Sequence, residues 1–269
     1  MRNKRLIILL SILGGIAAVI ILMSAIFTVY STEAKCLTDY GDDNSIYSLI
    51  TVVDDKIEAV ADEFKFQNIF LVDEQKILDE VNARVPRAEA VDVECIFPNK
   101  LVVKYNLVTE ALQFKVGEKY VISGESGKIV RESNNNVAQT SDTVIDVTPN
   151  QTPVITEGAS YVYSDSDCYD MRALKTILSL SSSLVDSNHQ RAFDKSAYES
   201  IDLADKNNVK IKMRKGVAFV LAVSEDKLAD AVQAMVSWYV DVTEDKLFHG
   251  EVLVHYNNVA EKIQIVEKT

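Results

Sequence analysis

Ser224 and Lys227 have the one spacing in this sequence that is typical of a catalytic site. A Ser-x-x-Lys pattern at the start of a predicted helix is used by serine acyl-transfer enzymes, in which the Lys takes the proton of the Ser. That chemistry also needs a second Ser-containing loop and a Lys-Thr-Gly strand, and Lys175-Thr176 is followed by Ile177 instead of Gly. We therefore expect Ser224 to cap a helix and not to act as a nucleophile.

The histidines and glycines offer no alternative chemistry. His249 and His255 are six residues apart on a predicted strand, which separates them by roughly 20 Å at ~3.3 Å per residue, and His189 lies in a polar stretch. The segment 123–127 contains two glycines but lacks the helix and the Lys-Ser or Lys-Thr pair of a phosphate-binding loop. We expect no catalytic residue, no metal site and no cofactor.

The composition excludes further classes of protein. The formal net charge is −12, and the first thirty residues hold three bases and no acids, so the remaining chain is more acidic still. Such a surface disfavours nucleic acid and anionic lipid as main partners. The cysteines are too few and too widely spaced for a disulfide framework or a metal-ligand pair: Cys36, Cys95 and Cys168.

The N-terminal sequence predicts a membrane anchor. Residues 6–30 form a run of 25 residues without a charge, which as a helix reaches roughly 37 Å, more than the ~30 Å hydrocarbon core. Bases precede this run and acids follow it, so residues 1–5 are predicted to be a cytoplasmic tail and the domains after residue 31 to lie outside a cell membrane that is crossed once. The alternative is cleavage as a secretory signal after Ala34.

Turn-forming residues divide the remaining chain. After a predicted juxtamembrane linker at 31–46, we predict a domain at 47–131, a linker at 132–152 and a second domain at 153–269. The first domain is predicted to contain a strand at 47–53, a helix at 54–64, a helix capped by Asp73, and a hairpin of 91–97 and 101–105. The second is predicted to contain a helix from Asp170, a hairpin of 209–213 and 217–223, an amphipathic helix at 228–239 and a strand at 250–256.

Several segments resemble a known family when they are taken in order. They are 68–73 (Asn-Ile-Phe-Leu-Val-Asp), the helix end at 84–86, the strand at 90–94, the Phe97-Pro98-Asn99 turn with its strand to 103, the segment 120–130, and the Thr-Pro-Val-Ile-Thr-Glu-Gly segment at 152–158. Together they resemble the FtsQ/DivIB cell-division proteins. The resemblance implies an α+β fold: an N-terminal transmembrane helix, a POTRA-like β-α-α-β-β domain, then a larger mixed α/β domain called the β domain. One departure is Asn106-Leu107, which stands where the family commonly has a Glu-Arg pair.

The resemblance also implies a function. It indicates a non-enzymatic divisome scaffold at the division septum, which recruits or regulates FtsB/DivIC-like and FtsL-like membrane coiled-coil proteins and other division proteins. In the family the partner adds a strand to an exposed sheet edge, because an edge presents unpaired N–H and C=O groups. The residues implied for this edge are Gly250, Val252, Leu253, Val254, His255 and Tyr256. The alternatives are that these residues form an internal strand, and that the protein is an anchored or secreted cell-envelope hydrolase with an unrecognised acidic site.

Overall fold

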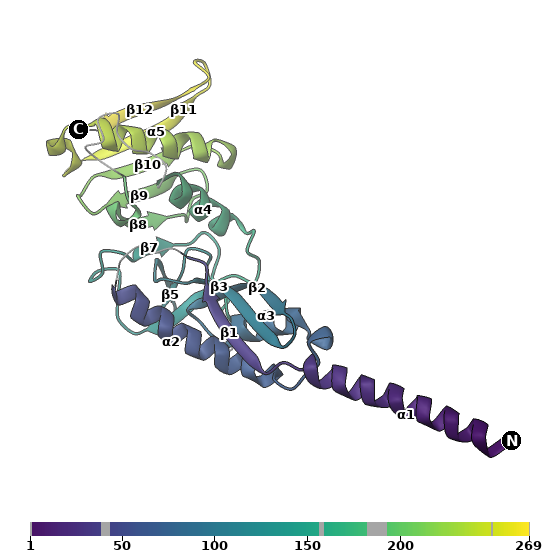
Figure 1. Cartoon of the computed structure of the whole chain (residues 1–269). Coiled ribbons are helices and arrows are strands. Elements are labelled where there is room, and N and C mark those ends of the chain that lie inside the picture. Colours follow the sequence, from purple (N-terminus) through teal and green to yellow (C-terminus); the bar gives the residue numbers. More distant parts are fainter. Residues whose placement is uncertain (1, 39–43, 156–158, 182–192, 249, 269) are drawn as a thin grey trace. The chain divides into compact units, whose positions relative to one another are not determined.

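The protein folds into two compact units of mixed helices and strands. The computed structural model describes residues 2–38, 44–155, 159–181, 193–248 and 250–268. Unit 1 is Met1–Leu107 and unit 2 is Val108–Thr269. Figure 1 labels their helices and strands along the chain.

The N-terminal helix corrects the prediction of a membrane anchor. Helix α1 is Arg2–Ile26, and its side chains are described for residues 11–19 and 21–26. A span needs about 20 consecutive apolar residues. Among the described residues, no helix combines the length and the apolar character that crossing a membrane requires. This finding overturns the transmembrane helix in the predicted fold class and the single-pass membrane location built on it.

Unit 1 is a small sheet with two helices on one face. After α1 its elements are β1 (Ser31–Cys36), α2 (Asn44–Ala61), the short 3-10 helices η1 (Asp62–Phe64) and η2 (Ile69–Leu71), α3 (Glu74–Arg84), β2 (Ala88–Ile96) and β3 (Lys100–Leu107). Within the described residues the sheet order is β1-β3-β2, with β1 parallel and β2 antiparallel to β3. Ile57 of α2 and Ile77 of α3 pack against Val103 and Tyr105 of β3 in one buried core.

Two elements of unit 1 differ from the predictions. The predicted strand at 47–53 is part of α2, because Ile46, Ile50, Val53 and Ile57 recur at helical spacing and join the same core. The predicted linker at 31–46 contains β1, which pairs with β3 over a sequence separation that no local pattern reports. The structure thus keeps the order β-α-α-β-β with a different first strand.

The predicted cap and hairpin of unit 1 are confirmed, with one irregularity. The Asp73 side chain accepts a hydrogen bond from the Lys76 N–H at 3.1 Å at the start of α3. In the hairpin of β2 and β3, a bulge between Ala90 and Asp92 leaves Val91 unpaired and exposed. Cys95 lies against the core, and burial is the main cause that raises its pKa to about 11.

Unit 2 is built on one large twisted sheet. Its elements are β4 (Leu112–Val116), β5 (Lys119–Ser123), β6 (Ile129–Ser133), β7 (Ile145–Thr148), α4 (Tyr169–Ser181), η3 (Lys195–Ala197), β8 (Tyr198–Asp202), β9 (Val209–Met213), β10 (Ala218–Ala222), η4 (Glu225–Lys227), α5 (Leu228–Asp241), η5 (Glu244–Leu247), β11 (Glu251–Asn257) and β12 (Lys262–Lys268). In the described part of the chain these strands form a nine-stranded sheet in the order β12-β11-β10-β9-β8-β7-β4-β5-β6.

The boundary between the units differs from the predicted linker at 132–152. Strands β4 and β5 and the first part of β6 fall in the predicted first domain, yet these strands belong to the large sheet because β4 pairs in parallel with β7. The turn-rich segment at 132–152 therefore lies within unit 2, and the chain divides between Leu107 and Val108.

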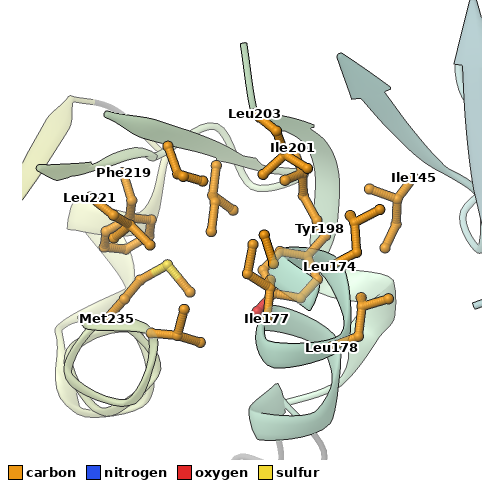
Figure 2. Close-up of a cluster of buried hydrophobic side chains, with 14 of the residues drawn as sticks. Ile145, Leu174, Ile177, Leu178, Tyr198, Ile201, Leu203, Phe219, Leu221 and Met235 are labelled. Atoms are coloured by element: carbon orange, nitrogen blue, oxygen red, sulfur yellow. The ribbon is translucent and has the colours of Figure 1, made fainter. Parts of the chain in front are cut away.

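Helices α4 and α5 cover the buried face of the large sheet. Leu174, Ile177 and Leu178 of α4 point toward Tyr198 and Ile201 of β8, while Met235 of α5 points toward Phe219 and Leu221 of β10 (Figure 2). Strand β9 alternates strictly: Val209, Ile211 and Met213 are buried, and the lysines between them are exposed. The predicted hairpin of β9 and β10 and the predicted helix at 228–239 are confirmed.

Candidate functional site

The predicted binding strand is internal to the sheet. Val252 to Tyr256 lie in β11, and Gly250 directly precedes it with a positive φ of 101°. Strand β11 pairs in parallel with β10 on one side and antiparallel with β12 on the other. Its backbone groups are therefore used on both sides, and the prediction that this strand is the exposed edge is wrong.

The side chains of β11 alternate between the two faces of the sheet. Val252 and Val254 are buried, and Tyr256 packs against the same core, where the Lys227 ammonium lies 5.3 Å from the centre of its ring. Leu253 and His255 face the opposite side and are half-buried. The predicted residues therefore shape both faces next to the sheet edge without forming that edge.

Strand β12 forms the open edge at this end of the sheet. Among the described residues, no strand lies on its outer side. The Ala218 N–H donates to the Gly250 carbonyl at 3.1 Å, so Gly250, and every second residue after it, turns its backbone toward β10. Leu253 and its neighbours at the alternate positions then turn toward β12. Since Leu253 pairs with Val266, the outward backbone groups of β12 are those of Ile263, Ile265 and Glu267.

The open edge is apolar at its centre and charged at its ends. On the face away from α5, Val220, Leu253 and Val266 lie side by side on β10, β11 and β12, and Val266 is 45% exposed. At the C-terminal end of β12, Lys268 pairs with Glu251 on this face and Glu267 pairs with Lys246 on the other. The centre of the strand, Gln264 to Val266, carries no charge.

A cleft accompanies the edge on the helix side. It has a volume of about 490 Å³ and lies between one flank of α5 and β12. Trp238 forms part of its wall and meets Phe219 edge-to-face, with ring centroids 5.4 Å apart. The other flank of α5 faces away, since Tyr239 packs against Phe193. The cleft is lined by Ala234, Ser237, Trp238, Asp241, Val242 and Ile265.

The opposite edge of the sheet is partly covered by the chain itself. Residues 160–162 run along the start of β6, where the Ile129 N–H donates to the Ser160 carbonyl and the Val162 N–H donates to the Gly127 carbonyl, both at 2.9 Å. Buried Asp170 accepts hydrogen bonds from the N–H groups of Asn150 and Gln151, which precede this covering segment in the sequence, and from the hydroxyl of Tyr163 (2.8 Å), which follows it directly. Burial, followed by the hydrogen bond to Asp170, raises the pKa of Tyr163.

The residues with catalytic spacing make other contacts. Ser224 stands at the N-cap of η4 as expected, but its hydroxyl bonds the Asp226 carboxylate and not the helix backbone. The Lys227 ammonium lies over Tyr256, as described above. His189 and His249 are outside the described residues, and within the described part no cluster of His, Cys, Asp and Glu could hold a metal ion.

A second exposed apolar surface lies in unit 1. The rings of Phe27 and Phe97 both contact the ring of Phe70 in a tilted arrangement, and each of their centroids lies 5.1 Å from the centroid of Phe70. Phe66 and Leu71 nearby are largely exposed. These side chains come from turns and short helical segments and not from a strand.

Sequence reasoning missed β12, the strand that forms the edge. Its signal is the alternation of Ile263 and Ile265 with Gln264, preceded by the turn formers Asn257 and Asn258. This alternation is short and is followed only by charged and exposed residues, which makes it weak by itself. The pairing of β12 with β11 becomes evident only in the structure.

Comparison of the sequence with models of protein families and with curated proteins finds no match. The geometry of the edge and the resemblance in the sequence are therefore the grounds for a functional proposal.

Proposed function

We propose that this protein is a binding scaffold of the bacterial cell-division machinery and that a partner adds a strand to β12. The observation that carries the proposal is the open edge: Ile263, Ile265 and Glu267 turn their backbone N–H and C=O groups outward beside an uncharged strand centre. An extended segment satisfies such groups, and its alternate side chains then provide specificity.

The class of partner follows from the resemblance to the FtsQ/DivIB family. The family's partners are short coiled-coil division proteins of the FtsB/DivIC and FtsL types, and they bind a sheet edge near the end of the β domain. In the described part of this chain β12, and not β11, is the open edge at this end of the sheet, so the proposal gives β12 the role first assigned to Gly250 to Tyr256. The Val220, Leu253 and Val266 stripe gives the added strand an apolar neighbour on one face.

The proposal is tested with two variants at one position. Glu267→Pro removes an outward N–H, whereas Glu267→Ala keeps it; both lose the ion pair with Lys246. Leaving the partner's carbonyl unpaired costs about 1–3 kcal/mol, so Glu267→Pro should bind the FtsB/DivIC-like protein of the same genome about tenfold or more weakly than Glu267→Ala. Binding is measured by calorimetry with the full chain, and circular dichroism checks that both variants fold.

Two outcomes contradict the proposal. Equal affinity of the two folded variants removes β12 as the binding edge. Failure of the unmodified chain to bind either the FtsB/DivIC-like or the FtsL-like protein removes the division partners. The hydrolase alternative has its own measurement, the release of soluble fragments from purified cell wall by the full chain, and a turnover above that of buffer would replace the scaffold proposal.

A further inference from the structure

The cleft between α5 and β12 lies where the side chains of an added strand must go. In a sheet, neighbouring strands are ~4.8 Å apart, and directly paired residues point to the same face. Ile265 pairs with Val254, which is fully buried on the α5 side, and Ile265 itself lines the cleft. The partner residue opposite Ile265 therefore projects toward α5 beside the same cleft.

The flank of α5 beside this position carries small side chains and one aromatic side chain. Ala234 and Ser237 are small, so they leave space, while Trp238 presents an aromatic surface that is half-buried in the free protein. Large apolar side chains, aromatic ones above all, dominate binding energy when they enter such a recess at an interface. Asp241 is the acidic residue among those that line the cleft, which disfavours an acidic residue in the occupant because like charges repel.

We propose that this cleft is a specificity pocket for a large apolar side chain, aromatic in the best case, at the position of the partner segment that pairs with Ile265. The inference rests on the proposed strand addition and adds to it a requirement on the partner's sequence. The backbone edge accepts many extended segments, because N–H and C=O groups are common to all residues. The pocket selects among them by one side chain.

Trp238 makes the pocket directly observable, because it is the only tryptophan of the chain. The full chain is titrated with the FtsB/DivIC-like protein, in which any tryptophan has been replaced by Phe, and the emission of Trp238 is followed. Hydrogen exchange at residues 262–268 reports strand addition in the same samples. We expect a blue shift of the emission that saturates together with protection of β12.

A matched pair of variants tests the pocket without touching the edge. Ser237→Phe fills the cleft, whereas Gln233→Phe places the same side chain on an exposed position of α5 that does not line it. We expect Ser237→Phe to weaken binding at least tenfold and Gln233→Phe to change it less than twofold. An alanine scan of the partner segment should identify one large apolar residue whose loss also abolishes the emission shift.

The outcomes separate this inference from the proposed function. Protection of β12 without any change in Trp238 emission, together with equal binding of the two Phe variants, overturns the pocket and leaves the strand addition intact. Absence of both protection and binding overturns both. An emission change that depends on the concentration of the chain alone, with dimerisation in sedimentation, assigns the cleft to a second copy and also overturns the inference. If Ser237→Phe does not fold, the alanine scan decides.

Discussion

The two edges of the large sheet differ in whether another segment of the chain covers their backbone groups. At the β6 end, residues 160–162 pair along the start of the strand, and Asp170 holds the segments on either side of them. At the β12 end, the outward groups of Ile263, Ile265 and Glu267 have no strand beside them in the part of the chain that the structure describes. The chain thus provides a cover for one edge and leaves the other available.

The difference matters because the unpaired backbone groups of an open edge can pair nonspecifically with other chains. Native sheets protect their edges with charges, bulges or covering segments. Strand β12 has charges at its ends, Lys262 and Lys268, but its centre, Gln264 to Val266, is uncharged and lies beside a cleft. The charges thus protect the ends of β12 from nonspecific pairing and leave its centre open, as the proposed strand addition requires.

The largest effect is expected from removing the cover of β6. Asp170→Ala leaves three donors without their acceptor, on Asn150, Gln151 and Tyr163, which should cost about 3 kcal/mol or more. Asp170→Asn keeps one carbonyl oxygen and should cost less. Because the chain has two units, hydrogen exchange of the Ile129 and Val162 amides is a better measure than a single unfolding transition. Wild-type protection of both amides in Asp170→Ala would show that the cover is held by other contacts.

A smaller effect is expected at the turn that supports the open end. Gly216 has a φ of 114°, and a Cβ there would lie 2.5 Å from the backbone oxygen of Phe248, in the connection that leads to β11. Gly216→Ala should therefore destabilise unit 2 by about 1–3 kcal/mol. Gly117→Ala is the matched control, because Gly117 also has a positive φ, 62°, but open space around it. Thermal unfolding of the two variants should place Gly216→Ala lower; the reverse order would mean that the clash is relieved by movement of the 248 backbone.

Local patterns predicted the parts of this fold that depend on neighbours in sequence. Helix α5 and the hairpin of β9 and β10 follow from periodicity and a turn, and the structure confirms them. The segment 47–53 was misassigned because β-branched residues favour strands by composition, while its helical spacing extends into the following residues up to Ile57. The composition of this segment thus favoured a strand, whereas its spacing favoured a helix. The helix forms because it buries these apolar residues in the core of unit 1.

Pairings between distant segments could not be predicted in this way. The parallel pairing of β1 with β3, and that of β4 with β7, join segments that carry no mutual signal in the sequence. The position of the open edge was missed for the same reason. The alternation of residues located β11 but could not show that β12 would pair with its outer side. Which strand is an edge is a property of the whole sheet, and a single strand's sequence reports only its two faces.

The smallest effect is expected from the ion pair at the end of the open edge. Lys246 and Glu267 are 2.7 Å apart with both side chains nearly half exposed, so their mutual attraction is screened by water and salt. A double-mutant cycle with Lys246→Ala and Glu267→Ala should give a coupling free energy below about 1 kcal/mol in urea unfolding, and less again at high salt. A larger, salt-insensitive coupling would mean that this pair fixes the C-terminal end of β12. In that case Glu267→Ala would itself disturb the edge, and the comparison with Glu267→Pro would have to be repeated at Ile263, whose backbone also faces outward.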